Sequence, residues 1–289
     1  MLISDAFELF RIDHIVYNNQ SSKTEEMNRL ACRSLLNFTG DIEIEELTFD
    51  KVRKWKEHLL RTRSEGTVRG YIIKLRVVLK YLAQHGYKGI INHEVVGVPR
   101  RGDTVVEFLT PDEVQRFLDA ALEPRAGYSR VARKRNAAII SLLYASGIRV
   151  SELCSLNRDF LKPGMNEFTV VGKGRKARIC FVDERAKYFL NEYLMLRSDN
   201  YPALFIGNLG RRITKDNIAV MFRVNSRRSG INAHPHTMRH SYATNLLKNN
   251  TNLLFVSKFL GHSSVQTTEM YTHVVDEDLR AIYNQKHTI

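Results

Sequence analysis

The sequence predicts a mainly α-helical protein with a small β component, arranged as an N-terminal helical bundle followed by an α+β domain. Apolar residues recur at helical spacing through the first hundred residues. One pair of short β-type segments lies in the second half, and a stretch with Pro99, Gly102 and no helical period separates the two parts. Because 289 residues suffice for two cores, we expect domains over 1–98 and 110–289, joined by a linker over 99–109.

Two capping signals and an apolar stripe predict the N-terminal helices. Ser22-Lys-Thr-Glu25 resembles a capping box, which predicts a helix from Ser22 to about Phe38. Thr48 is the expected N-cap of the next helix, and Gly86 ends the helix after it. The apolar residues of these two helices are Val52, Trp55, Leu59 and Leu60, and then Ile72, Leu75, Leu79 and Leu82. The expected bundle has one apolar stripe per helix and basic outer faces.

The second domain opens on a strong helix start and contains the one predicted hairpin. Thr110 as N-cap, proline at the next position and Glu113 two residues further on define that start. Residues 168–171 and 177–182 predict two strands around a turn that holds Gly172-Lys173-Gly174. Further helices are expected at about 184–197, 214–229, 237–249, 252–260 and 264–271.

The charge of the chain indicates a polyanionic partner. Lys and Arg outnumber Asp and Glu by 44 to 31, a formal net charge of +13, and nucleic acid is the commonest polyanion. Residues 51–80 hold ten basic side chains against two acidic ones, and residues 125–135 hold five basic and no acidic ones. One such run is usually a solvated helix face, but two in different halves indicate two walls of a DNA channel. The candidate DNA-binding residues are Arg53, Lys54, Arg61, Arg63, Arg69, Lys74, Arg76, Arg133, Lys134 and Arg135.

The cysteines and the N-terminal residues indicate the cellular compartment of the protein. Cys32, Cys154 and Cys180 are far apart and form no C-x-x-C pair, which argues against a disulfide framework and a structural zinc site and fits a reducing cytoplasm. The N-terminus lacks the basic and apolar regions of a signal peptide, and no apolar run approaches about 18 residues. We therefore expect a cytoplasmic protein with no membrane partner.

Two arginines, a histidine and a tyrosine suit the cleavage of a DNA strand without a metal. Such cleavage needs a nucleophile at phosphorus, cations on the non-bridging oxygens and an acid for the leaving oxygen. Arg149 and Arg239 are candidate cations, because the planar guanidinium binds phosphate through two hydrogen bonds and keeps its proton. His236 precedes Arg239 by one helical turn, and Tyr271 supplies a phenol. Each residue taken alone is more often a surface or half-buried side chain.

Two other chemistries fit poorly. His236 and His240 stand at i, i+4, but the metalloprotease pattern needs Glu where Thr237 stands, so no metal site is expected. Gly172-Lys173-Gly174 does not satisfy the phosphate-loop pattern, and its glycines equally permit a tight hairpin turn.

Five segments jointly resemble the tyrosine recombinase (phage integrase) family, in order and in spacing. They are Gly147-Ile-Arg149-Val-Ser-Glu152-Leu, Gly172-Lys173-Gly174, His236-Thr-Met-Arg239-His240, Leu260-Gly261-His262 and Tyr271-Thr-His-Val. The resemblance is strong over 110–289, weaker over 1–98, and closest to the Xer-type site-specific recombinases. It implies a SAM-like core-binding bundle and a catalytic domain that together form a C-shaped DNA clamp.

The resemblance also implies how the phosphate is attacked and held. Tyr271 would attack the scissile phosphate, forming a 3′-phosphotyrosyl link and releasing a 5′-hydroxyl. Arg149, Arg239 and His262 would bind the phosphate and stabilise the transition state. His262 stands where some relatives have tryptophan.

The remaining roles implied by the resemblance concern proton transfer and orientation. Lys173 at the hairpin tip is the general acid for the leaving 5′-oxygen, His236 assists proton transfer near the tyrosine, and Glu152 orients Arg149 or the histidines. Because the covalent link keeps the energy of the phosphodiester bond, no metal, ATP or other cofactor is expected.

The C-terminal tail predicts a protein partner. Leu279, Ile282 and Tyr283 fall on one face of a helix expected over about 276–286. From the residues alone, packing on its own domain and docking into a neighbouring protomer are equally open. The resemblance implies docking, which would link a homo- or hetero-tetramer on two DNA sites.

The function that the resemblance implies is site-specific recombination at a specific short site in double-stranded DNA. Xer-like resolution of chromosome or plasmid dimers, and hence chromosome partition, is the leading role. The alternatives are an integrase or resolvase of a mobile element, a type IB topoisomerase-like enzyme and a DNA-binding protein without catalysis. The complete set of catalytic residues speaks against the last, and the length and tail speak against the topoisomerase. A second recombinase and an accessory activator stay open as partners.

Overall fold

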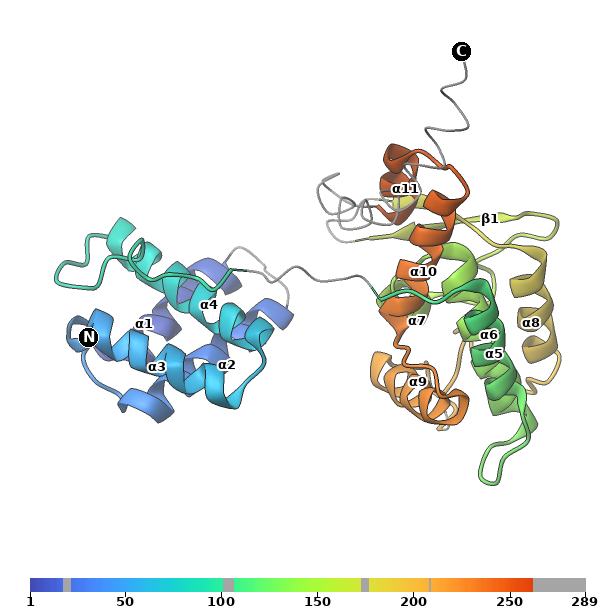
Figure 1. The fold of residues 1–289 in the computed structure, drawn as a ribbon, viewed down its shortest axis with the longest axis horizontal. Helices are drawn as coiled ribbons and strands as arrows, with labels where there is room; N and C mark the ends of the chain where they lie inside the picture. Colours follow the sequence, from blue (N-terminus) through green and yellow to red (C-terminus); the bar gives the residue numbers. More distant parts are fainter. Residues whose placement is uncertain (18–21, 101–106, 173–176, 208, 262–289) are drawn as a thin grey trace, which may run out of the picture. The chain divides into compact units, whose positions relative to one another are not determined.

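The computed structural model forms two compact units, Met1–Thr104 and Val105–Ile289 (Figure 1). The residues that the structure describes are 1–17, 22–100, 107–172, 177–207 and 209–261. The predicted helices over 264–271 and 276–286 therefore lie outside the described residues. The assignment of a DNA-binding domain to 1–98 and a catalytic domain to 110–289 stays a prediction.

The N-terminal unit is helical throughout its described part, apart from its connecting loops. Its elements are α1 (Ile3–Phe10), the π-helix η1 (Arg11–Val16), α2 (Ser22–Thr39), the 3-10 helix η2 (Ile44–Glu46), α3 (Phe49–Thr62) and α4 (Glu65–Gln84). The predicted helix from Ser22 to about Phe38 is thus confirmed as α2. The hydroxyl of Thr48 accepts a hydrogen bond from the backbone N–H of Lys51 at 3.3 Å, which confirms it as the N-cap of α3.

The core of this unit follows the predicted apolar stripes. Every residue of the predicted stripe on α4 is completely buried, as is Trp55 on α3. Leu60 is the exception, because 47% of it is exposed and it lies off the buried face of α3. Burial of one face per helix holds the bundle together and leaves the opposite faces to charged residues.

The C-terminal unit is built around one buried helix. Its elements are α5 (Pro111–Leu122), α6 (Arg130–Ser146), α7 (Val150–Ser155), β1 (Glu167–Val171), β2 (Ala177–Phe181), α8 (Glu184–Leu194), α9 (Lys215–Ser229), α10 (Pro235–Lys248) and α11 (Leu253–Leu260). Helix α6 packs against α5, α8 and α10, and its residues 136–143 are all buried. A helix covered on several sides in this way is expected to be apolar almost all round, as this segment is.

Local signals place most element boundaries in this unit. Thr110 and Glu113 form the predicted capping box at the start of α5, with reciprocal hydrogen bonds of 2.9 and 3.3 Å. The predicted pair of strands is confirmed as β1 and β2, which pair antiparallel with Phe168 opposite Cys180. Helix α8 ends at Leu194 rather than near 197. Helix α10 starts at Pro235 rather than 237, because His234 caps it and proline fits the first helical position.

The structure also bears on two further features, disulfide bonds and membrane-spanning helices. The three cysteines are free thiols, so no disulfide contributes to stability. Among the helices in the described ranges, none combines the length and the apolar character needed to cross a bilayer.

Candidate active site

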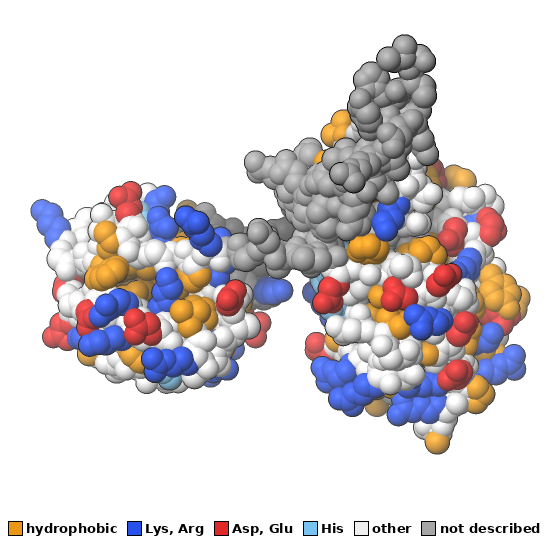
Figure 2. Space-filling view, viewed as in Figure 1, with side chains coloured by type: hydrophobic (Ala, Val, Ile, Leu, Met, Phe, Trp, Pro, Cys, Tyr) orange, Lys and Arg blue, Asp and Glu red, His pale blue; other side chains and the backbone are white. Residues whose placement is uncertain are grey.

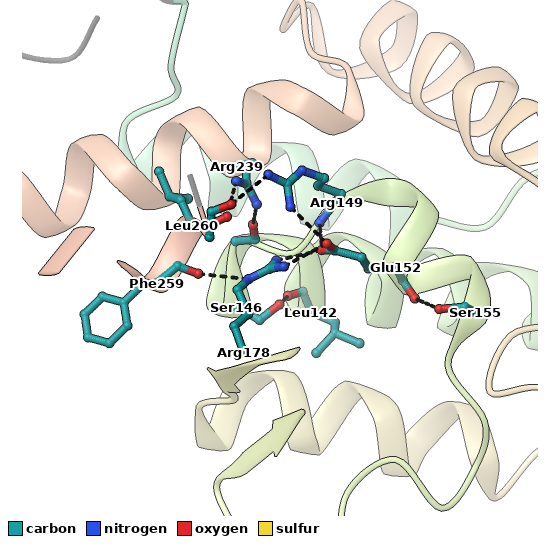
Figure 3. Close-up of polar contacts among 11 residues, drawn as sticks. Leu142, Ser146, Arg149, Glu152, Ser155, Arg178, Arg239, Phe259 and Leu260 are labelled. Atoms are coloured by element: carbon teal, nitrogen blue, oxygen red, sulfur yellow. Dashed lines mark hydrogen bonds and ion pairs between the residues drawn. The ribbon is translucent and has the colours of Figure 1, made fainter. Parts of the chain in front are cut away.

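Four segments of the C-terminal unit meet at one place. Charged side chains come from the start of α7 with the residue before it, from strand β2 and from the first turns of α10, and backbone carbonyls come from the C-terminal end of α11 (Figure 3). The side chains are Arg149, Glu152, Arg178 and Arg239, which we call the arginine cluster. Glu152 and Arg239 are each only 5% exposed. A buried set of this kind needs specific partners, because unpaired buried charges are costly.

Arg149 and Glu152 are joined by the local fold. Arg149 is the N-cap residue of α7, and Glu152 is at its third position. The Glu152 carboxylate accepts the backbone N–H of Arg149 at 2.7 Å and its Nη1 at 3.0 Å. The four-residue segment therefore sets the orientation of the Arg149 side chain through a helix-capping arrangement.

Arg178 reaches the same carboxylate from strand β2. Its Nη1 donates to Glu152 Oε1 at 2.8 Å and its Nη2 to Oε2 at 2.6 Å, a parallel two-bond geometry. Burial by itself would raise the pKa of Glu152, but the hydrogen bonds from Arg178 and Arg149 outweigh it and lower the pKa to about 2. Glu152 is therefore ionised at neutral pH.

Arg239 connects the end of α6 to the end of α11. Its Nη1 donates to the carbonyl oxygen of Gly147 at 2.6 Å and its Nη2 to that of Leu260 at 2.5 Å. Gly147 has φ +60°, and a Cβ there would lie 2.4 Å from Cδ1 of Tyr242. Only glycine therefore gives α6 this end, which aims its carbonyl at Arg239.

The C-terminal end of α11 is where the three arginines meet. The carbonyl oxygens of Phe259, Leu260 and Gly261 accept hydrogen bonds from Arg178 at 3.1 Å, Arg239 at 2.5 Å and Arg149 at 3.3 Å, respectively. The last carbonyls of a helix have no partner inside it and carry its partial negative charge, so cations are favoured there. The next residue in the chain is His262.

The histidines of α10 differ in exposure. His236 is exposed at the second position of the helix, one turn before Arg239. His240 is half-buried, and burial followed by the charges of His236 and His234 lowers its pKa to about 4. His240 is therefore neutral at pH 7 and suits a packing role better than a charged one. The imidazole of His234 accepts the N–H of Thr237 as the helix cap.

Three predicted catalytic residues lie outside the described residues, namely Lys173, His262 and Tyr271. Of the remaining predicted set, the structure brings Arg149, Glu152 and Arg239 together. Arg178 was missed by the sequence reasoning. A sequence signal existed, because Arg178 stands two residues before Cys180 in a predicted strand and therefore shares the face of the buried Cys180.

The arginine cluster carries excess positive charge. Three guanidinium groups and one carboxylate leave a local charge of +2. Arg149 is its accessible member, with 29% of its side chain exposed. A fixed positive site with planar donors can hold the oxygens of a phosphate and stabilise further negative charge as it develops.

The candidate DNA-binding residues of the N-terminal unit are mostly exposed. Arg53 and Lys54 on α3 each pair with Asp50 at 2.7 Å, and Arg61 and Arg63 are exposed near its end. The three on α4 are half-buried, and Arg69 donates to the carbonyl of Pro99. Figure 2 shows Lys and Arg side chains spread over the visible face of this unit, with Asp and Glu among them.

The basic run on α6 has partners within its own unit. Arg133 donates to the carbonyl of Leu122 at 3.2 Å, Lys134 pairs with Glu192 at 2.7 Å, and Arg135 donates to the carbonyl of Ile206 at 2.8 Å. These contacts fasten α6 to the surrounding elements. Contact between these three residues and DNA stays a prediction.

The arginine cluster is a largely buried and positively charged site, and its planar donors suit it to binding a phosphodiester. The chain belongs to the phage integrase family, whose family model matches residues 107–278. It is 32% identical to tyrosine recombinase XerC of Thermodesulfovibrio yellowstonii, over 96% of this chain and 95% of that protein. It is 30% identical to tyrosine recombinase XerD of Oceanobacillus iheyensis, over 99% and 97%. The predicted enzyme class is thus confirmed.

Solved structures share the fold. The XerA recombinase is 26% identical, with a TM-score of 0.54 and 99% of both chains covered. The integrase of transposon Tn1549 in complex with transposon right end DNA has a TM-score of 0.79 at 17% identity, with both chains fully covered. XerH recombinase bound to a palindromic difH substrate has a TM-score of 0.76 at 21% identity, over 92% of this chain and 80% of that one. The predicted fold class is therefore confirmed.

Proposed function

We propose that this protein is a site-specific DNA recombinase that cuts and rejoins strands through a 3′-phosphotyrosyl intermediate at Tyr271. The observation that carries the proposal is the arginine cluster, in which Arg149 and Arg239 are held on one helix end beside an ionised Glu152. Membership of the phage integrase family and the XerC and XerD relatives support it.

The arginines bind the scissile phosphate and stabilise the transition state. The phenolate of Tyr271 attacks phosphorus, and the bond to the 5′-oxygen breaks. Arg149, Arg239 and His262 contact the non-bridging oxygens, where negative charge accumulates. Free tyrosine has a pKa near 10, and nearby positive charge lowers it, so the local +2 charge favours the ionised nucleophile.

Proton transfer completes each half-reaction. Lys173 donates a proton to the leaving 5′-oxygen, and His236, one turn from Arg239, assists transfer near the tyrosine. A new 5′-hydroxyl then attacks the phosphotyrosyl bond and releases Tyr271. Because the covalent link keeps the bond energy, rejoining needs no nucleotide cofactor, and the protein groups named here supply the charge that a metal would supply.

Double-stranded DNA at a specific short site is the proposed substrate. The neighbouring XerH and Tn1549 integrase structures are bound to DNA, which supports a DNA partner. The unit with α3 and α4 serves as the core-binding domain, with Arg53, Lys54, Arg61 and Arg63 as its exposed cations. They attract the phosphate backbone without reading bases.

Xer-like resolution of chromosome or plasmid dimers is the proposed biological role, because the curated relatives at about 30% identity are XerC and XerD proteins. The working form is a homo- or hetero-tetramer on two sites, linked through residues 276–286, with an accessory activator as a further partner. As its substrate is the DNA of the cell, we place the protein in the cytoplasm.

Trapping of the covalent intermediate tests the function. The protein is mixed with nicked duplexes made from candidate sites of its own genome, denatured, and resolved for a protein band shifted by DNA. Wild type should give the adduct without added metal, and Tyr271→Phe should not. An adduct that survives in Tyr271→Phe would contradict the assignment of the nucleophile. Tight DNA binding with no adduct from wild type on any substrate would contradict the recombinase function.

A further inference from the structure

Arg178 occupies a position in β2 where the strand pattern calls for an apolar residue. Its side chain points to the same face as Cys180, pairs in register with the buried Val170, and is only 10% exposed. Arginine is rarely buried unless it is paired and fully hydrogen-bonded. The residue is therefore at this position for its contacts rather than for its bulk.

The guanidinium of Arg178 meets this requirement by binding two parts of the site. It binds both oxygens of Glu152 and, through Nε, the carbonyl of Phe259 at the end of α11 (Figure 3). Together with the two bonds from Arg149, the carboxylate accepts four hydrogen bonds, about its full acceptor capacity. Glu152 is therefore fixed on both sides, and Arg149 is held by a carboxylate that cannot rotate away.

Arg178 also contacts Gly261, the residue that precedes His262 in the chain. Gly261 has φ +62°, and a Cβ there would lie 2.7 Å from Cδ of Arg178. The stem of Arg178 thus packs directly against the last residue before His262. One side chain consequently touches the carboxylate that holds Arg149 and the backbone that leads to His262.

The charges give Arg178 a further effect. Glu152 in contact with Arg149 alone would cancel one of the two clamp charges, leaving +1 from Arg149, Arg239 and Glu152. Arg178 restores +2. Attack by a phenolate on a phosphodiester builds up a second negative charge on the non-bridging oxygens, so a doubly positive site stabilises the transition state more than the ground state.

We propose that Arg178 is a positioning residue of the recombination reaction. It fixes the Glu152 carboxylate so that Arg149 is presented to the phosphate, and it supplies the positive charge that Glu152 would otherwise cancel. The inference rests on the proposed function, since it concerns the phosphate clamp of that reaction.

The test compares three variants in single-turnover cleavage of a nicked duplex at saturating protein, with DNA affinity and Tm measured on the same samples. Arg178→Gln removes the charge, and Arg178→Lys keeps the charge but loses the two-bond geometry. Arg197→Gln is the matched control, because Arg197 is also buried and paired with a carboxylate, Asp199, in the same unit. Its further contacts are with the carbonyls of Tyr201, Ala203 and Leu204 and with the ring of Tyr193, and none of these residues belongs to the arginine cluster.

Arg178→Gln should slow adduct formation on the order of 100-fold, the effect of losing one preorganised charged donor group. Its affinity for DNA should stay within about threefold of wild type, because binding is dominated by other phosphate contacts. The cleavage rate of Arg178→Lys should lie between the rates of wild type and Arg178→Gln. Arg197→Gln should lower Tm while the folded protein cleaves within about threefold of wild type.

A pH profile separates positioning from mere structural support. Without Arg178, the buried Glu152 keeps only Arg149 as a partner, so its pKa rises and it takes up a proton at higher pH than in wild type. As the pH is lowered from about 8 to about 5, the cleavage rate of Arg178→Gln should therefore fall by a larger factor than the wild-type rate. A residue that only stabilised the fold would lower the rate equally at every pH.

The proposal is overturned if folded Arg178→Gln cleaves at nearly the wild-type rate, or if Arg197→Gln, at a comparable loss of Tm, loses as much cleavage as Arg178→Gln does. Should Arg178→Gln fail to fold, Arg178→Lys decides, and a folded lysine variant with the wild-type rate and pH profile overturns the proposal. If wild type itself gives no adduct, the proposed recombinase function is wrong and the role of Arg178 falls with it. That outcome is visible in wild type alone, so the two failures are distinguishable.

Discussion

Arg239 and Gly147, ninety-two positions apart in the chain, are joined by a 2.6 Å hydrogen bond from Nη1 to the backbone carbonyl. The bond makes the geometry of Arg239, the arginine proposed to bind the phosphate, depend on the last turn of α6. That turn in turn depends on a left-handed glycine in close contact with Tyr242. A backbone conformation therefore helps to build the proposed catalytic site, although it supplies no reacting group.

Gly147→Ala should destabilise the protein more than a change at an ordinary left-handed glycine. Gly164 has φ +77° but open space around it, whereas a Cβ at 147 overlaps the Tyr242 ring. Both alanines bear the cost of positive φ, of about 1 kcal/mol, and only Gly147→Ala adds the overlap, of about 1–3 kcal/mol. Urea unfolding of the two variants measures the difference. Equal losses would mean that the ring moves aside freely.

Ionisation of Glu152 should make the free energy of unfolding depend on pH in the acid range. Its folded pKa of about 2 lies below the ordinary 4.5, so the ionised form stabilises the fold above about pH 4.5, and that stability is lost as pH falls toward 2. The shift corresponds to about 3 kcal/mol. The free energy of unfolding should therefore fall less between pH 7 and pH 3 in Glu152→Gln than in wild type, since other carboxylates contribute equally to both. Parallel pH curves would contradict this.

Lys173→Ala should slow strand cleavage far more than it weakens DNA binding. A general acid typically contributes about 10²–10⁴-fold to the rate. A substrate with sulfur in place of the bridging 5′-oxygen releases a thiolate that needs no proton, so it should restore cleavage in Lys173→Ala. Single-turnover rates on the oxygen and sulfur substrates provide the comparison. Equal defects on both substrates would assign Lys173 to phosphate binding.

Binding to DNA should depend steeply on salt, through the exposed cations of α3. Each phosphate contact contributes a slope of about −0.9 in a plot of log affinity against log salt. The double variant Arg61→Ala with Arg63→Ala should therefore flatten the slope by up to about 2. Lys23→Ala removes an exposed charge from the acidic N-terminal segment and should leave the slope unchanged. A wild-type slope near zero would remove the argument for a DNA-binding face.

What could be predicted from sequence was local or carried by family motifs. Thr110 and Glu113 predict the start of α5 because both halves of the capping box lie within four residues. Arg149, Glu152 and Arg239 were found by their motifs. Arg178 was missed because its partner Glu152 is 26 positions away, and only the fold brings a strand and a helix start together. The π-helical turn η1 was also missed, because no compositional signal distinguishes it from a continued α-helix.

In the proposed tetramer, the attachment of all three arginines to the end of α11 would couple DNA binding to subunit assembly. A phosphate that enters the arginine cluster shares its guanidinium groups with the carbonyls of residues 259–261, and the chain runs on from there to His262 and Tyr271. Linkage is reciprocal, so a neighbouring subunit that alters DNA affinity by holding this chain end must itself be held more or less tightly, by the same factor, once DNA is bound. In the proposed tetramer, subunit assembly and DNA binding would therefore change each other's equilibrium constant by the same factor.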